Sequence, residues 1–277
     1  MLRAPRHQER EDSMTQLHVE TGSRRLDGEA GVVAELSWAA ATDTGRRREV
    51  NQDAFLASYP LFVVADGMGG HEAGDIASAA VVRRLSEAVQ NPRPVDRDAV
   101  TDALDQAVED MELEIGQSDV GTGTTVTGIL ADTSPVQPAG VSWTVFNVGD
   151  SRVYRLVGEE LSQMTLDHSV VQELLSIGAI TPEEAEHHPH SNVITRAVGF
   201  SGESVPDYSD AVPERASRWL ICSDGLTKEL TDYGLRHFLL AAESPEQAVV
   251  ALMGAALENG GRDNVSVVVL DEMVTSD

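Results

Sequence analysis

The chain has 277 residues, of which 41% are hydrophobic, so it is long enough to bury a core in one large domain or two small ones. Its 46 acidic residues against 20 basic ones give a formal charge of −26, which disfavours duplex nucleic acid and anionic membranes as partners. Cys222 is the one cysteine, which excludes an internal disulfide, and the longest apolar run (249–257) is far short of the ~20 residues that span a bilayer, so we expect a cytoplasmic protein.

The first half of the chain predicts a leader, strands and two helices. Residues 1–33 are polar and aperiodic, which indicates a mobile N-terminal leader. From residue 36 onward, strand-like runs (LSWAAAT, DAFLASY, LFVVAD) precede two helical patterns (ASAAVVRRLSEAVQ, VTDALDQAVEDMELEIG). Three β-rich runs, GTTVTGILA, SWTVFNVGD and SRVYRLVG, then predict a meander.

A flap is expected at about residues 165–193, inserted between strands. It contains a predicted helix at 170–177 and a second helix that starts at Thr181-Pro182, where Thr181 is the N-cap. The remainder predicts a strand at RWLICSD, helices after Thr231 and from Pro245 to about 258, and a last strand at VSVVVLD. We therefore expect one folded domain at 34–273 and a short tail at 274–277.

Several aspartates share one placement, at the ends of predicted strands and close to a glycine. Asp66 follows LFVVA, Asp150 follows TVFNVG, Asp224 follows WLICS, and Asp263 precedes VSVVVL. A single Asp-Gly pair is more often a surface turn, but a set without His or Cys suits Mg²⁺ or Mn²⁺. We therefore predict that Asp66 is a metal ligand and that the Gly67 carbonyl is a second oxygen donor.

Such a metal cluster can activate water and stabilise charge on a phosphoryl group. Upstream, TGRRREVNQD offers arginines that can hold phosphate bidentately, although a run of three arginines alone is more often a solvated turn.

Eight segments resemble, in the same order, the bacterial branch of the metal-dependent type 2C Ser/Thr protein phosphatases (the PPM family). They extend over about residues 36–271 and read GRRREVNQDAF, VVADGMGGHEAGDIAS, GTTVTGIL, NVGDSRVYRL, LDHSVVQELLSIGAITPEEA, NVITRAVG, LICSDGL and GRDNVSVVVL. The resemblance implies an α+β fold, an αββα sandwich of two central antiparallel sheets flanked by helices. It also implies an enzyme that hydrolyses phosphoserine and phosphothreonine with two Mn²⁺ or Mg²⁺ ions per site.

The resemblance also implies a role for each site residue. Asp66 would bridge two metals, with the Gly67 carbonyl on one of them and Asp224 and Asp263 on the other. Asp150 matches a third, weaker metal position, and Arg48 matches the arginine that holds the substrate phosphate. Asp53 is expected to reach a metal through a bound water. Expected partners are phosphoprotein substrates and a bacterial Ser/Thr kinase that the enzyme opposes, with no nucleic acid, no membrane and a monomeric chain.

Two positions depart from the family pattern. Gln52 stands where many members carry Glu, which predicts lower metal affinity. Met68 stands where eukaryotic members place a His that is a candidate general acid, so the leaving group must be protonated by another group.

Several features of the sequence also allow other interpretations. The HHPH run at His187, His188 and His190 is read as a solvated loop rather than a zinc site, and His71 as a helix-start residue rather than a proton donor. A kinase or P-loop hydrolase is excluded because Lys228 is the one lysine and no GxxxxGK[ST] precedes it. A non-enzymatic phosphoprotein-binding module and a two-metal nuclease are disfavoured by the full ligand set and by the −26 charge.

Overall fold

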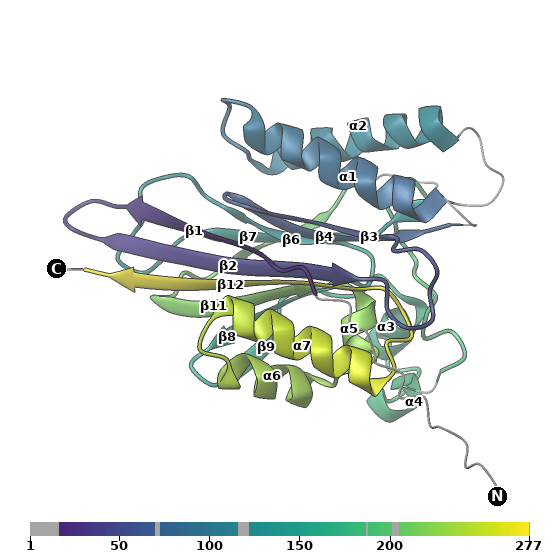
Figure 1. Ribbon diagram of the computed structural model, residues 1–277. Coiled ribbons are helices and arrows are strands. Elements are labelled where there is room, and N and C mark those ends of the chain that lie inside the picture. The colour runs from purple at the N-terminus through teal and green to yellow at the C-terminus, as the bar shows by residue number, and fades with distance from the viewer. Residues whose placement is uncertain (1–16, 70–72, 116–121, 187, 201–204, 277) are drawn as a thin grey trace, which may run out of the picture.

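The computed structural model describes residues 17–69, 73–115, 122–186, 188–200 and 205–276, and it is a four-layer αββα sandwich (Figure 1). The first sheet has the order β1-β2-β12-β11-β8-β9, made of Glu20–Asp27, Val33–Asp43, Val265–Thr275, Ala216–Cys222, Arg152–Val157 and Glu160–Gln163. The second has the order β10-β7-β6-β4-β3, made of Asp207–Ala211, Trp143–Val148, Val126–Ala131, Leu61–Met68 and Asp53–Ser58, and short β5 (Gly123–Thr124) also pairs with β4. All these pairings are antiparallel, so the predicted fold class is confirmed.

Two pairs of helices cover the outer faces of the sheets (Figure 1). Helices α1 (Ala73–Gln90) and α2 (Arg97–Ile115) pack on the second sheet, and α6 (Asp232–Ala241) and α7 (Pro245–Asn259) pack on the first. In α1, Ala77, Ala80 and Val81 recur at helical spacing and are fully buried. None of the helices in the described ranges is long and apolar enough to cross a bilayer.

Strand alternation builds the cores on the two faces of the first sheet. In β12, Val267 and Val269 point toward the cluster under α7, whereas Val268 and Leu270 point into the layer between the sheets. That inter-sheet layer also holds Trp143 and other aromatic side chains. Because both faces of this strand are buried, VSVVVL is apolar except for Ser266, which is fully buried and hydrogen-bonded to Thr42 and Ser223.

A long connection follows β9, and its described parts are residues 164–186, 188–200 and 205–206. This segment contains α3 (Val170–Ser176) and α4 (Pro182–Glu186). Ser169 caps α3 by accepting a hydrogen bond from the Gln172 N–H, and Thr181 forms a capping box with Glu184 at 3.3 and 2.9 Å. The helix starts predicted for the flap are therefore confirmed.

The prediction of a mobile leader up to residue 33 is wrong for residues 20–33. Residues 20–27 form β1, which pairs with β2 from Glu20↔Ala40 to Asp27↔Val33. The strand lies at the edge of the sheet and most of its side chains are exposed, so backbone hydrogen bonds rather than an apolar pattern define it. Residues 1–16 lie outside the described part of the chain.

The predicted tail also begins too early. Strand β12 continues to Thr275, and Val274 is buried in the layer between the sheets. Buried and exposed residues alternate at the end of β12, but two of these positions are the acids Asp271 and Glu272, so the sequence there does not show an apolar alternation.

Candidate metal centre

Asp53 and Asp66 are brought face to face by the register of β3 and β4, in which they pair directly. Both backbone groups of Asp66 are held by Thr125: the Asp66 N–H donates to Thr125 Oγ1 at 3.0 Å, and the Asp66 carbonyl accepts from the Thr125 N–H at 2.8 Å. Asp53 is buried, with 8% of its surface exposed. The strand pairing therefore places two carboxylates at one edge of the second sheet.

Gly67 lies where the backbone is too crowded for a side chain. A Cβ there would be 1.9 Å from the Gly74 carbonyl oxygen and 2.7 Å from the Gln52 carbonyl oxygen. The Gly67 N–H donates to that Gln52 carbonyl at 3.0 Å. Glycine is thus required for the start of α1 to pack against the end of β4, beside Asp66.

The first sheet contributes Asp224 and Asp263. Asp224 begins the short helix α5 (Asp224–Thr227) directly after β11, and Asp263 lies in the loop before β12. These two loops touch, because a Cβ on Gly225 would be 1.8 Å from the Asn264 carbonyl oxygen. The side chains of both aspartates are mostly buried, with 14% and 17% exposed. Burial, Asp53 and then the charge of Asp224 raise the pKa of Asp66, so the carboxylates contributed from the two sheets lie near one another.

Asp150 lies in the turn between β7 and β8. Burial and then the charge of Asp224 raise the pKa of Asp150, and the charge of Asp150 adds to burial in raising the pKa of Asp66. All the predicted ligands therefore converge on the edge where the two sheets meet, together with Asp53.

Four of the clustered carboxyl groups are hard to ionise. Burial, followed by the charges of nearby acids, raises the pKa of Asp53 to about 7 and that of Asp150 to about 7. Burial and the surrounding aspartates raise the pKa of Asp66 well above its ordinary value, and burial raises the pKa of Asp224 against the opposing charge of Lys228. At neutral pH the cluster therefore needs added positive charge to be fully ionised.

Two basic side chains supply part of that charge. Arg48 Nη2 lies 2.9 Å from Asp263 Oδ1, and Lys228 Nζ lies 2.5 Å from Asp224 Oδ2 and 3.1 Å from Asp263 Oδ2. Burial alone would raise the pKa of Asp263, but the charges of Lys228 and Arg48 outweigh it and lower this pKa. Arg48 is half-exposed, so its guanidinium lies at the cluster and can still meet a phosphate from solvent.

The residues fit a divalent cation by the chemistry of their donors. Asp53 Oδ1 and Asp224 Oδ1 are buried oxygens without a hydrogen-bond partner among the described residues, which is costly for a carboxylate that is not bound to a cation. Carboxylate oxygens without thiolate or imidazole suit Mg²⁺ or Mn²⁺. Among the described residues, no three acidic, His or Cys side chains surround one point closely enough to hold a metal ion.

Sequence reasoning missed the polar residues that support the aspartates. Ser223 Oγ donates to Asp53 Oδ2 at 2.7 Å and accepts from the Ser266 N–H at 3.0 Å. The Asn264 amide donates to the carbonyls of Thr44 and Val50 and accepts from the Gln52 N–H at 2.9 Å, which holds the loop that carries Arg48. The sequence feature that could have identified them is their position next to a predicted ligand, since Ser223 precedes Asp224 and Asn264 follows Asp263.

Lys228 was also missed as a site residue. Its place four residues after Asp224, at the end of α5, is the spacing at which side chains meet on a helix.

Gln52, which departs from the family pattern, packs its amide against α1. A Cβ on Gly74 would be 2.6 Å from Gln52 Nε2. Met68, the other departure, lies at the end of β4 opposite Gly123.

Two of the described histidines, His168 and His188, accept hydrogen bonds from nearby backbone N–H groups. His168 Nδ1 accepts from the Gly149 N–H at 3.1 Å, and its Nε2 lies 3.0 Å from Asp207, so this side chain fixes the entry to the flap as predicted. His190 donates its backbone N–H to His188 Nδ1. His71 and His187 lie outside the described residues.

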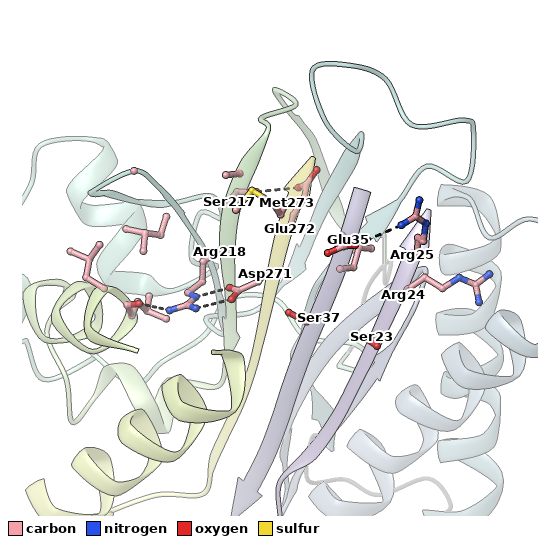
Figure 2. Close-up of a pocket in the computed structure, with 16 residues that line it drawn as sticks. Ser23, Arg24, Arg25, Glu35, Ser37, Ser217, Arg218, Asp271, Glu272 and Met273 are labelled. Carbon is pink, nitrogen blue, oxygen red and sulfur yellow. Dashed lines mark hydrogen bonds and ion pairs between the residues drawn. The ribbon is translucent and has the colours of Figure 1, made fainter. Parts of the chain in front are cut away.

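A separate pocket of about 720 Å³ lies against the first sheet and is lined by residues of β1, β2, β11 and β12 (Figure 2). Arg218, at its wall, is fully engaged by Asp271 at 2.6 and 2.7 Å and by the carbonyls of Leu239 and Ala242. Its lining does not include any of the predicted ligands.

Comparison with known proteins identifies relatives over most of the chain. A model of the family Protein phosphatase 2C matches residues 42–257. The chain is 38% identical over 248 residues to the serine/threonine protein phosphatase PstP of Mycobacterium tuberculosis, an alignment that covers 87% of this chain and 46% of PstP. It is 33% identical over 246 residues to the serine/threonine phosphatase stp of Listeria monocytogenes, covering 84% and 95% of the two chains.

The solved structures agree with this result. The catalytic domain of PstP in complex with 2 manganese ions is 34% identical, with a TM-score of 0.75, and the match covers 87% of this chain and 99% of that one. The chain thus spans about half the length of full PstP and nearly all of its catalytic domain and of the Listeria enzyme. With a family model over most of its length and relatives above 30% identity, the chain belongs to the protein phosphatase 2C family.

Proposed function

We propose that this chain is a Mn²⁺- or Mg²⁺-dependent protein-serine/threonine phosphatase that uses the carboxylate cluster at the meeting edge of its two sheets. The observation that carries the proposal is the convergence of Asp66, Asp150, Asp224 and Asp263 beside Arg48, with buried carboxylate oxygens that lack partners.

Asp66, Gly67, Asp224 and Asp263 would hold two metal ions, with Asp53 reaching them through water and Asp150 at a third position. When bound, these ions supply charge for the phosphoryl oxygens and activate water as a nucleophile. The manganese complex of the PstP catalytic domain, a relative over 87% of this chain, supports this choice of metal.

The chain's own residues position the substrate and keep the acids in place. Arg48 is half-exposed and presents a guanidinium that can take a phosphate bidentately while it still neighbours Asp263. Ser223 and Asn264 fix Asp53 and the Arg48 loop, so the phosphate would be held against the aspartate edge. Hydrolysis breaks the phosphorus–oxygen bond to the serine or threonine, which leaves inorganic phosphate and a free hydroxyl group.

The expected biological setting belongs to the same proposal. Substrates are phosphoserine and phosphothreonine proteins, modified by a Ser/Thr kinase that this enzyme opposes in the cytoplasm. The buried free Cys222 fits a reducing compartment, and the −26 charge fits a monomer that does not bind nucleic acid.

The test is phosphate release from a phosphothreonine peptide by the purified chain. We expect turnover with Mn²⁺ or Mg²⁺, reversible loss in EDTA, and loss of nearly all activity in Asp66→Asn. Asp105→Asn, an exposed change on α2, is the matched control. Turnover that persists in EDTA would contradict the metal role, and peptide binding without turnover in the wild type would favour the phosphoprotein-binding module.

A further inference from the structure

Lys228 is the one lysine of the chain, and its ammonium group contacts two of the proposed metal ligands. Nζ lies 2.5 Å from Asp224 Oδ2 and 3.1 Å from Asp263 Oδ2. The backbone fixes this approach, because the Lys228 N–H donates to the Asp224 carbonyl at 2.8 Å and so completes the turn of α5. Two-thirds of the side chain is covered.

These contacts use oxygens that a metal ion would need. On Asp263, Oδ1 is bound by Arg48 at 2.9 Å and by the Asn264 N–H at 2.9 Å, and Oδ2 is bound by Lys228. On Asp224, Oδ2 is bound by Lys228, and Oδ1 is buried without a partner. A dication that joins Asp224 to Asp263 must therefore displace the ammonium group from at least one oxygen.

A simple surface ion pair would not have this arrangement. An i,i+4 pair between Lys and Asp is ordinary on an exposed helix and contributes little. Lys228 instead joins an acid at the start of α5 to an acid in the loop before β12, and both acids are mostly buried. Its long flexible stem allows the charged end to move into solvent while the backbone stays in place.

We propose that Lys228 is a tethered cation that competes with the divalent ion for Asp224 and Asp263. It stabilises the metal-free fold by pairing with both acids, and it lowers the affinity of the metal position that these acids form. The inference depends on the proposed metal role of Asp224 and Asp263, and it adds a residue of this chain that sets the loading of the site.

Calorimetric titration of the full chain with Mn²⁺ tests the competition. We expect Lys228→Gln to bind one of its Mn²⁺ ions roughly tenfold more tightly than the wild type, because a positive competitor is gone. The same variant should unfold at a lower temperature in EDTA, since the two acids lose their partner. Arg84→Gln, which removes a basic residue paired with Asp110 far from the site, is the control for loss of one positive charge.

The outcomes distinguish a failure of the Lys228 competition from a failure of the metal role of the cluster. Equal or weaker Mn²⁺ binding by Lys228→Gln, with a wild type that binds two ions, would overturn the competition alone. A wild type that binds no Mn²⁺ would overturn the metal role of the cluster and the competition with it.

A second measurement uses the wild-type residue and does not depend on the variant folding. Reductive methylation with ¹³C-formaldehyde labels one lysine side chain and the α-amino group, and Lys228→Gln assigns the lysine signal. On saturation with Mg²⁺ we expect this signal to move toward the position of free dimethyl-lysine, because the ammonium is released to solvent. A signal that stays in place at saturation would show that Lys228 is not displaced.

Discussion

Asp53→Asn tests the electrostatic account of the site by separating stability from metal binding. In the metal-free protein Asp53 is buried and its pKa is raised from 3.8 to about 7, chiefly by burial. A raised acid pKa means that the folded state binds the proton more tightly than the unfolded state. The contribution of Asp53 to the stability of the metal-free protein is therefore largest at low pH, and it is lost as the pH rises from about 4 to about 7.

The size of the effect follows from two opposing contributions. Ionising Asp53 in the folded chain costs about 4 kcal/mol at pH 7.5 and about 2 kcal/mol at pH 5, relative to the unfolded chain. Asparagine keeps an oxygen for the Ser223 hydroxyl but places its NH₂ where Asp53 Oδ1 has no partner, which costs about 1–2 kcal/mol. We expect a net gain of about 2–3 kcal/mol at pH 7.5, or roughly 4–10 °C in Tm, and almost none at pH 5.

The assay is thermal unfolding in EDTA at pH 5 and 7.5, repeated with saturating Mn²⁺. With Mn²⁺ the order should reverse, because the wild type gains more from the ion than a variant that lacks the carboxylate. Asp105→Asn should change none of these values. An Asp53→Asn chain that is less stable than wild type in EDTA at pH 7.5 would refute the reasoning and show that Asp53 serves mainly as a partner of Ser223.

Three further substitutions test other parts of the site. Arg48→Ala should raise KM for a phosphopeptide about tenfold with little change in the Mn²⁺ titration, because its half-exposed pair with Asp263 contributes less than its contact with phosphate; a shifted metal titration with unchanged KM would contradict this. Asp150→Asn should keep two Mn²⁺ by calorimetry and lower kcat more for phosphothreonine than for p-nitrophenyl phosphate, whose leaving group needs little protonation; equal losses would exclude a part in proton delivery. Gly67→Ala should lower stability by about 1–3 kcal/mol and weaken Mn²⁺ binding, because its Cβ would lie 1.9 Å from the Gly74 oxygen, and unchanged values of both would show that α1 can shift freely.

The order of strands and helices could be predicted from the sequence where side chains carry a periodic pattern. Strand β12 begins with a short, largely apolar run that is buried on both faces, and the buried residues of helix α1 recur at spacings of three to four. Strand β1 could not be predicted in this way, because its edge position leaves most side chains in water and its pairing is made by the backbone. The composition of β1 predicts neither the strand with which it pairs nor the register of that pairing.

The site likewise has a part that could be predicted from the sequence and a part that could not. The aspartates stand at strand ends and were found from their position, but their mutual contact depends on the meeting of two sheets and needed the structure. Lys228 is the clearest case. The sequence shows a lysine four residues after Asp224, whereas its second contact, with Asp263, comes from a loop 35 residues away. A single-residue spacing cannot predict a bridge to a distant loop.

The location of the site explains why metal loss should not unfold the chain. Asp53 and Asp66 belong to the second sheet, Asp224 and Asp263 to the first, so the cluster joins the sheets at one edge only. Farther inside, the sheets are held by a series of aromatic contacts. The ring centroid of Phe62 lies 5.2 Å from that of Trp38 and 6.1 Å from that of Trp143, and the centroids of Trp143 and Trp219 are 6.0 Å apart. These rings pack in the inter-sheet core, and their packing does not depend on the ionisation of the aspartates. Because the apolar layer fixes the two sheets independently, the edge can hold carboxylates whose repulsion is relieved by Lys228 in the metal-free chain and by divalent cations in the active one.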